Sequence, residues 1–147
     1  MIDERRAFDQ LVRDFAARAD LALEQDDDGV WTIPIGENVF AHLLYHTGLR
    51  QVLAYASIGE LPAGGPNDEA RARALLTANW YWQDTKGFTL ALEHETRHLV
   101  VQDRRAFAAF ESPSHLADYL TRMGETVRDL TLALGGLSDA VETGKEC

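Results

Sequence analysis

The periodicity of the apolar residues constrains what this chain can fold into more than any other feature of the sequence. Apolar residues stand at every second position over residues 31–35 and 39–45, and residues 52–58 are rich in Ala, Val, Leu and Tyr. A period of two is typical of β-strands, whose side chains point alternately to opposite faces of a sheet. Only a short turn, Gly36-Glu37 or Thr47-Gly48, separates the segments, and strands joined in this way are antiparallel. The sequence therefore predicts a three-stranded antiparallel meander.

The first strand of this meander contains a proline, Pro34, which cannot donate a hydrogen bond to a neighbouring strand. We therefore expect the strand to lie at an edge of the sheet. Its apolar residues, Trp31, Ile33 and Ile35, would then form an exposed edge that either meets a partner or risks aggregation. Pairing with an extended peptide is one way in which proteins use such an edge.

Two segments on either side of the meander are predicted to be helical. Residues 3 to about 18 carry an apolar stripe at helical spacing. After the Pro- and Gly-rich residues 61–66, which we interpret as a loop, Asn67 or Asp68 can cap a second helix. This helix is expected to run to about Trp82.

The second half of the chain predicts a hairpin followed by a helix. Alternation over residues 88–92 and β-branching over residues 99–103 predict two strands, joined by a polar turn at residues 94–97. The last helix begins at Ser112-Pro113, where Ser can cap it and Pro suits the first helical position, and is expected to end at Gly135-Gly136.

The resulting order is α-β-β-β-α-β-β-α, which predicts the α+β class with one twisted antiparallel sheet packed by helices. The length of 147 residues fits a single domain with a core of its own. We assign this domain to residues 1–137 and expect residues 138–147, which are small and polar, to form a flexible C-terminal tail.

The charge of the chain narrows the classes of partner. Its 24 acidic and 14 basic residues give a net charge of −10, and no basic patch for a nucleic acid is found. No apolar run is long enough to insert into a membrane, and the N-terminus lacks the pattern of a signal peptide, so we expect a cytoplasmic protein. The one cysteine, Cys147, cannot form an internal disulfide.

One motif, His94-Glu95-Thr96-Arg97-His98, matches the H-E-x-x-H pattern of zinc hydrolases. On a helix this spacing would place both imidazoles on one face, with the glutamate as general base. Along a strand, residues four apart are separated by about 13 Å, too far to share a metal ion. Because strand-like segments flank the motif, we predict a polar hairpin turn and keep a zinc hydrolase only as a distant alternative.

Two further groups of possible metal ligands are interpreted structurally. His42 and His46 lie within an alternating segment, so we expect half-buried strand residues. The acidic run at residues 26–28 lacks the alternating ligands and the later glutamate of an EF-hand, and is expected to be a solvated turn. No nucleophile elbow, phosphate loop or dinucleotide motif occurs. The sequence therefore predicts no catalytic residue, no metal and no cofactor.

The aromatic segment Trp80-Tyr81-Trp82 offers more apolar surface than one helix face can bury. It is either a core anchor with an exposed rim or a surface for self-association, since aromatic residues concentrate binding energy at interfaces.

A set of residues in the second half follows the pattern of a known family. Paired leucines, a small residue and an asparagine close a helix, and a glycine turn, a strand with an acid after it, a short turn and a second strand follow. The matching residues are Leu75, Leu76, Asn79, Gly87, Leu90, Leu92, Glu93, Leu99 and Val101. In this pattern, in the order of its elements, in its size and in its acidity, the sequence resembles the class I type III secretion chaperones, the Tir-chaperone family.

This resemblance implies a function without catalysis or cofactor. Members form homodimers that hold the N-terminal chaperone-binding region of an effector in an extended form, keep it soluble and export-competent, and deliver it to the export apparatus. By resemblance, the protein would be a virulence factor in the cytoplasm of a Gram-negative bacterium. The implied dimer residues are Leu76, Trp80 and Trp82, and the implied effector-binding residues are Trp31, Ile33, Phe40, His42 and Leu44.

Two alternatives stay open at this point. The chain could be a regulator or adaptor of the same fold whose client is not an effector. Phe40 and Leu44 could also be ordinary core residues.

Overall fold

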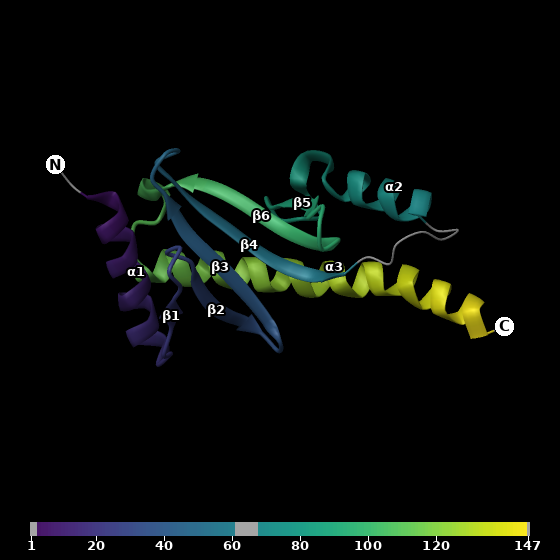
Figure 1. Ribbon diagram of the computed structural model, residues 1–147, viewed down its shortest axis with the longest axis horizontal. Coiled ribbons are helices and arrows are strands. Elements are labelled where there is room, and N and C mark those ends of the chain that lie inside the picture. The colour runs from purple at the N-terminus through teal and green to yellow at the C-terminus, as the bar shows by residue number, and fades with distance from the viewer. Residues whose placement is uncertain (1–2, 61–67, 147) are drawn as a thin grey trace.

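The computed structural model describes residues 3–60 and 68–146, and the predicted α+β order is confirmed (Figure 1). Within these two ranges the α-helices are α1 (Glu4–Ala19), α2 (Asp68–Ala78) and α3 (Pro113–Glu146). Two short 3-10 helices are η1 (Trp80–Trp82) and η2 (Phe107–Ala109). The strands are β1 (Glu24–Gln25), β2 (Trp31–Gly36), β3 (Val39–His46), β4 (Gln51–Glu60), β5 (Thr89–Leu92) and β6 (His98–Ala106).

The strands form one antiparallel sheet in the order β1-β2-β3-β4-β6-β5. The meander and the hairpin predicted from the period of two are its two halves, and β6 joins them by pairing with β4 along most of its length. The short β1, which the sequence analysis did not predict, pairs with the first residues of β2 through Glu24↔Thr32 and Gln25↔Trp31.

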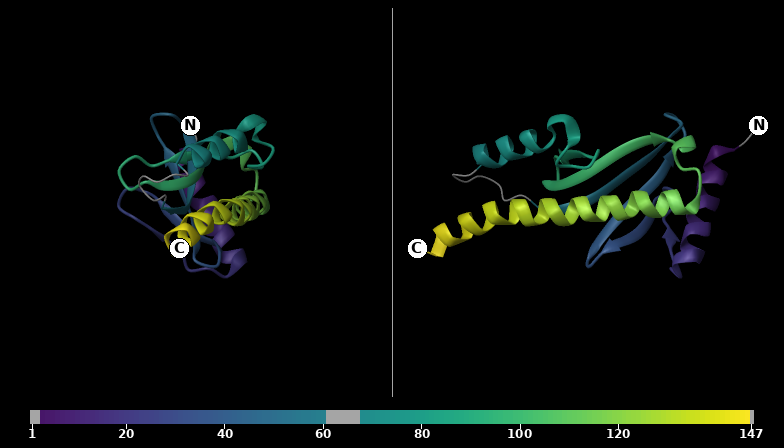
Figure 2. Two further views of the ribbon diagram at one scale, coloured as in Figure 1. Left: turned by 90° about the vertical axis from the view of Figure 1, so that its right-hand side faces the viewer. Right: turned by 180° about the vertical axis from the view of Figure 1, so that it is seen from behind.

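The core lies between the sheet and two helices. α3 runs along one face of the sheet, and α1 crosses one end of it (Figure 2). Phe8 and Val12 of α1 and Met123 of α3 are fully buried against inward-facing strand residues such as Ile33 and Leu43. These residues recur at helical spacing in the helices and at alternate positions in the strands, as burial on a single face requires.

The expectation of an exposed apolar edge at β2 is wrong. Trp31 and Ile33 point into the core and are buried, and Ile35 is half-buried against it. Pro34 itself lies at an edge, as predicted: it pairs with Phe40 of β3 on one side, and on the other side β1, among the described strands, pairs only with Trp31 and Thr32. The proline therefore marks the end of strand pairing on this side, and the apolar residues around it serve the core.

Two helix ends also differ from their predictions. α2 ends at Ala78, short of Trp82, because Tyr81 and Trp82 have left-handed backbone conformations with φ values of 52° and 57°. α3 continues past Gly135-Gly136 to Glu146. A glycine inside a helix costs only about 1 kcal/mol relative to alanine, so two of them need not end a long helix.

The remaining expectations about chain ends and loops are not tested. Asn67 and the loop at residues 61–66 lie outside the described residues, and the flexibility of residues 138–147 stays a prediction. None of the helices in residues 3–60 and 68–146 combines the length and the apolar character that a bilayer span requires.

One close contact fixes α3 against the end of β2. A Cβ atom built on Gly124 would lie 2.5 Å from the carbonyl oxygen of Ile35. This distance is too short for any residue with a side chain. Glycine at this position lets the helix backbone touch the strand, which sets the depth at which α3 packs.

Candidate binding surfaces

We call the face of the sheet opposite α1 and α3 the open face. It carries a groove. Alternation along β3 directs Ala41 and Leu43 to the core and Phe40, His42 and Leu44 to the open face. A groove of about 1060 Å³ runs across β3, β4, β6 and β5, and the residues that line it include His42, Leu44, Leu53, Tyr55, Val100 and Trp82. The groove is large, mostly apolar and uncovered by any described element, which are the properties of a binding surface.

His42 occupies the β3 end of this groove. Its ring stacks on that of Tyr55 on the paired strand, with 4.8 Å between centroids, and its Nδ1 lies 3.2 Å from the Thr32 hydroxyl. Partial burial lowers the pKa of His42, and the carboxylate of Asp26 opposes this shift. The imidazole is therefore mostly neutral at pH 7, as suits a groove lined by apolar side chains.

The five residues expected to contact an effector do not lie together. His42 and Leu44 are half-buried on the open face, and Phe40 lies on the same face with 47% of its surface exposed. Trp31 and Ile33 lie on the opposite face in the core, where the Trp31 indole donates a hydrogen bond to Asp9 (3.0 Å). Only the three β3 residues are thus placed where a partner could reach them.

The three residues expected at a dimer interface are all exposed, together with a fourth. The exposed fractions are 73% for Leu76, 70% for Trp80, 68% for Tyr81 and 52% for Trp82. We call these four residues the aromatic cluster. Tyr81 belongs to the aromatic segment of the sequence but is not among the residues expected at a dimer interface. Such a concentration of exposed rings is unusual on an isolated subunit and is typical of an interface.

The backbone of the aromatic cluster is held in place by β5. The Asn79 side chain donates to the carbonyl oxygen of Leu90 (3.1 Å) and accepts from its amide (2.8 Å), as a neighbouring strand would. The Trp82 indole donates to the Thr89 hydroxyl (3.4 Å). Because Tyr81 and Trp82 are non-glycine residues with left-handed backbones, each conformation costs about 1–2 kcal/mol. The fold thus maintains a strained segment that points its rings to solvent, a combination that often marks a functional site.

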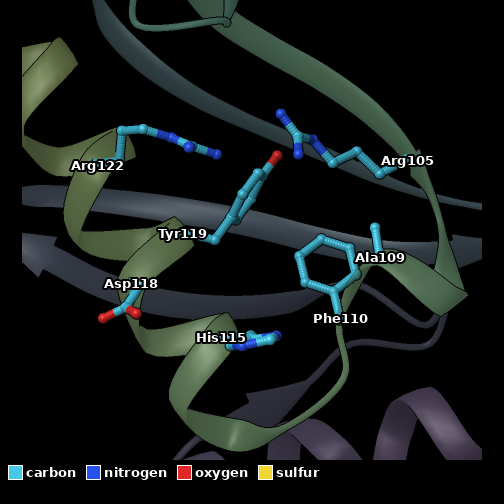
Figure 3. A pocket seen from close by; sticks show the side chains of 7 residues that line it. All are labelled: Arg105, Ala109, Phe110, His115, Asp118, Tyr119 and Arg122. Carbon is cyan, nitrogen blue, oxygen red and sulfur yellow. The ribbon is translucent and has the colours of Figure 1, made fainter.

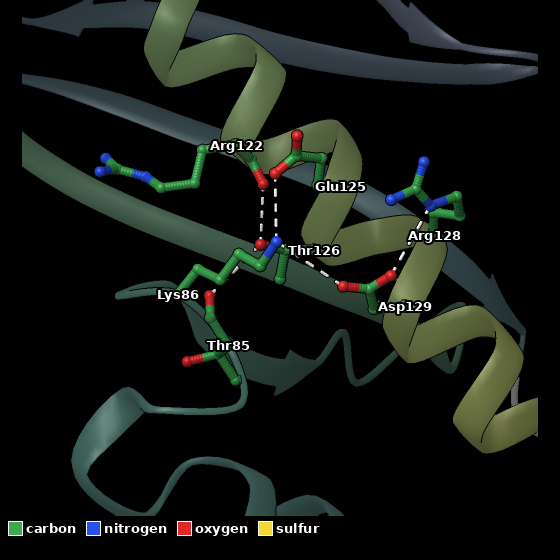
Figure 4. Close-up of polar contacts among 7 residues, drawn as sticks. All are labelled: Thr85, Lys86, Arg122, Glu125, Thr126, Arg128 and Asp129. Carbon is green, nitrogen blue, oxygen red and sulfur yellow. Dashed lines mark hydrogen bonds and ion pairs between the residues drawn. The ribbon is translucent and has the colours of Figure 1, made fainter.

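A second set of contacts fixes the end of this segment to α3 (Figure 4). The Lys86 ammonium lies 3.1 Å from a Glu125 carboxylate oxygen and 3.7 Å from one of Asp129. The buried Thr126 hydroxyl donates to the Arg122 carbonyl oxygen one turn earlier in α3 (2.8 Å), and it also lies 3.4 Å from the carbonyl oxygen of Thr85. The cluster is therefore positioned from both sides, by the sheet and by the long helix.

The H-E-x-x-H motif lies in the turn between β5 and β6, as predicted. The Glu93 amide donates to the His98 carbonyl oxygen (2.7 Å), which closes the hairpin. The Glu93 carboxylate accepts hydrogen bonds from the Thr96 hydroxyl and the amides of Thr96 and Glu95, and these bonds lower its pKa. The helix that a zinc site of this type requires is absent from the motif. Within residues 3–60 and 68–146, no group of three or more His, Cys, Asp or Glu is placed to hold a metal ion.

A comparison with known families gives one match over most of the chain. The Tir chaperone protein (CesT) family matches residues 10–131. No curated protein matches the chain significantly.

Several solved structures share the fold. A chain of the HopA1-SchA chaperone-effector complex is 15% identical and has a TM-score of 0.69, with 87% of this chain and 95% of that chain covered. For the Yersinia pestis type III secretion chaperone SycH in complex with a stable fragment of YscM2, these values are 18%, 0.60, 80% and 94%. For the heterodimeric ExoU-SpcU complex from the type III secretion system of Pseudomonas aeruginosa, they are 17%, 0.58, 82% and 92%. At these identities the likeness shows the fold.

Proposed function

Because this chain belongs to the Tir chaperone protein (CesT) family, we propose that it is a type III secretion chaperone. It binds the N-terminal chaperone-binding region of a secreted effector in extended form and keeps it soluble and export-competent. The observation that carries this proposal is the apolar groove on the open face, which no described element of the chain covers. Structures of the same fold are described as chaperone–effector complexes, which supports the assignment.

The β3 end of the groove is the part that we assign to the effector. Phe40, His42 and Leu44 project from one strand to one face, so they offer a row of sites about 7 Å apart, the spacing of alternate side chains in an extended peptide. Trp31 and Ile33 act from the core by supporting β2 and β3, and do not contact the effector themselves.

The Trp82 end of the groove is the part that we assign to a second subunit. Arg71 is the one buried residue of α2, and Leu75 and Ala78 pack partly against the core, whereas Leu76 leaves 73% of its surface exposed. A homodimer in which the aromatic clusters meet, through Leu76, Trp80 and Trp82, would cover them, because a two-fold interface presents the same patch from both sides. Effector and second subunit then occupy different ends of one groove.

The chaperone acts by binding alone, without catalysis, in the cytoplasm of a Gram-negative bacterium. It delivers its client to the export apparatus. A regulator or adaptor with a non-effector client would use the same surfaces, so the identity of the client decides between these two functions.

Co-expression of the chain with the neighbouring reading frames, followed by capture and identification of the bound protein, tests the proposal. We expect one secreted protein whose N-terminal segment is protected from proteolysis in the complex. Phe40→Asp should weaken binding, because it places a charge in the effector part of the open face. Leu49→Asp is the matched control, since Leu49 is similarly exposed but lies in the turn between β3 and β4. Protection of a segment other than the N-terminal one, or equal binding by both variants, would contradict the proposal.

A further inference from the structure

A small pocket outside both proposed binding surfaces lies where the beginning of α3 meets the end of β6 (Figure 3). It has a volume of about 200 Å³, and the residues that line it include Arg105, Phe110, His115, Asp118, Tyr119 and Arg122. This volume is enough for the end of one side chain. Its polar groups are unusual for a chain of net charge −10, because two of them are guanidinium groups.

Tyr119 stands between these two guanidinium groups. The Cζ of Arg105 lies 5.4 Å from the centre of the Tyr119 ring, and the Cζ of Arg122 lies 5.6 Å from it. Arg122 also lies 5.6 Å from the ring of Phe88. At these distances the rings attract both cations and fix their positions before any ligand arrives.

Only one of the two arginines is neutralised by an acid. Asp103 accepts hydrogen bonds from the Arg105 Nε (2.8 Å) and from the Tyr119 hydroxyl (3.0 Å). Burial raises the pKa of Tyr119, so the phenol keeps its proton and continues to donate this bond. Arg105, Asp103 and Tyr119 therefore form a hydrogen-bonded group with no net charge.

Arg122 has no such acid. Its Nε is buried and has no hydrogen-bond partner among the described residues, and none of the ion pairs found in that part of the chain includes Arg122. Asp118 lies one helical turn earlier on α3, but its carboxylate is directed away from the Arg122 guanidinium (Figure 3). The guanidinium of Arg122 therefore carries a positive charge that no described carboxylate compensates, and an acid supplied by a partner would be stabilised beside it.

We propose that this pocket binds a single carboxylate, from an aspartate or glutamate side chain of the bound client. This inference rests on the proposed function, since the client is the molecule that supplies the acid. A monoanion matches the one unpaired guanidinium, whereas a dianion such as phosphate would leave one of its charges uncompensated in the pocket. The planar guanidinium accepts a carboxylate through paired hydrogen bonds, and the Phe110 and Tyr119 rings provide apolar contact for its methylene groups.

The chemistry of the pocket can be tested without a client. We would titrate the wild-type chain with N-acetylglutamate amide, with the isosteric N-acetylglutamine amide and with inorganic phosphate, and follow the Nε–H resonances of the arginines by NMR. We expect the Arg122 resonance, assigned by its loss in Arg122→Gln, to shift in a saturable way with the glutamate probe only. Equal shifts with the two amino-acid probes, no saturable shift at all, or tighter binding of phosphate would overturn the proposal.

The source of the carboxylate is tested in the client complex. Arg122→Gln should weaken client binding about tenfold, the usual effect of losing one charge-assisted contact. Arg128→Gln, which makes the same charge change at an exposed position of α3, should leave affinity unchanged. One acidic residue of the client, replaced by its amide, should weaken binding to the wild type but not to Arg122→Gln.

Equal losses for every acid of the client, unchanged in the Arg122→Gln variant, would overturn the assignment of one client carboxylate to this pocket. Failure to find any client would instead contradict the proposed function, and the titration would still decide whether the pocket binds a carboxylate. If Arg122→Gln does not fold, the Arg122 resonance is assigned through its backbone signals in the wild-type chain, and the three probes still decide whether the pocket binds a carboxylate.

Discussion

Asn79 shows how one side chain can determine the position of a whole surface. Its amide makes two hydrogen bonds to the backbone of Leu90 and so replaces a neighbouring strand at this point of β5. The asparagine is part of the pattern that links this sequence to its family, but the pattern alone does not reveal what the side chain binds. The structure gives that reason, and it places Asn79 directly before the strained aromatic residues.

Asn79→Ala should therefore lower the free energy of unfolding by about 1–3 kcal/mol, because it leaves the amide and the carbonyl oxygen of Leu90 without partners. The measurement is urea unfolding followed by circular dichroism. Gln83→Ala removes a nearby exposed amide and should change stability by less than about 0.5 kcal/mol. Equal stability of the two variants would show that the bonds to Leu90 contribute nothing.

His42 gives a prediction about pH. Burial lowers its pKa in the folded state below the ordinary histidine value of 6.5, so the unfolded state binds more protons once the pH falls below that value. The free energy of unfolding should therefore decrease as the pH is lowered from about 6.5 toward the folded pKa. His42→Gln should reduce this loss, as measured by urea unfolding across the range. A variant with the wild-type pH dependence would contradict the assignment to His42.

At the scale of elements, most strands of the sheet can be predicted from the sequence, whereas the short edge strand β1 and the order of the strands cannot. The period of two identifies β2, β3, β4 and the β5–β6 hairpin because each has a buried face. β1 has two residues, too few to show any period. The pairing of β6 with β4 depends on contacts between segments far apart in the chain, which no local pattern records. The end of α2 is set by two left-handed residues that are not glycines.

The sequence also predicts part of the candidate binding surfaces, but not all of their residues. Alternation places Phe40, His42 and Leu44 on one face, but it places Trp31 and Ile33 on one face as well, and does not say which face is buried. The aromatic segment Trp80-Tyr81-Trp82 is enough to suggest an interface, although the left-handed backbone that exposes Tyr81 could not be predicted. The pocket beside Arg122 joins residues of β6 and α3, so only the folded structure brings it together.

The aromatic cluster predicts how the subunits associate. Trp80→Asp places a charge in the centre of the proposed interface and should convert a dimer to a monomer at micromolar concentration, because hot-spot aromatics contribute most of the energy of such contacts. Sedimentation equilibrium measures this directly. Leu49→Asp, at a similarly exposed apolar position outside the cluster, should remain dimeric. A dimeric Trp80→Asp protein would refute an interface centred on this cluster.

At the scale of the whole molecule, the net charge of −10 and the exposed apolar surfaces are complementary properties. A chaperone that keeps an open groove and exposed rings needs a force that opposes unspecific association, and repulsion between like-charged molecules provides it. The charge does not select the client. It keeps a protein with exposed apolar surfaces soluble until the client binds.

This balance should depend on salt. Raising sodium chloride from about 10 mM to about 1 M shortens the screening length from roughly 30 to roughly 3 Å and removes most of the repulsion. We expect the client-free protein to form species larger than the dimer at high salt, as measured by light scattering. Tyr81→Ser, which removes an exposed ring without changing the charge, should aggregate less. Aggregation that is independent of salt would contradict this role for the charge.

The strand order has a consequence for synthesis on the ribosome. β4 pairs with β6 from Gln51↔Ala106 to Glu60↔His98. Because α2 and β5 lie between these strands in the chain, one edge of β4 stays unpaired until both have been synthesised. At roughly 5–20 residues per second, translation leaves this edge unpaired for seconds. The nascent chain thus passes through a stage in which it exposes an unpaired strand edge, the kind of surface through which proteins aggregate. A protein that protects other chains from aggregation before export is therefore itself prone to aggregate while it is being synthesised.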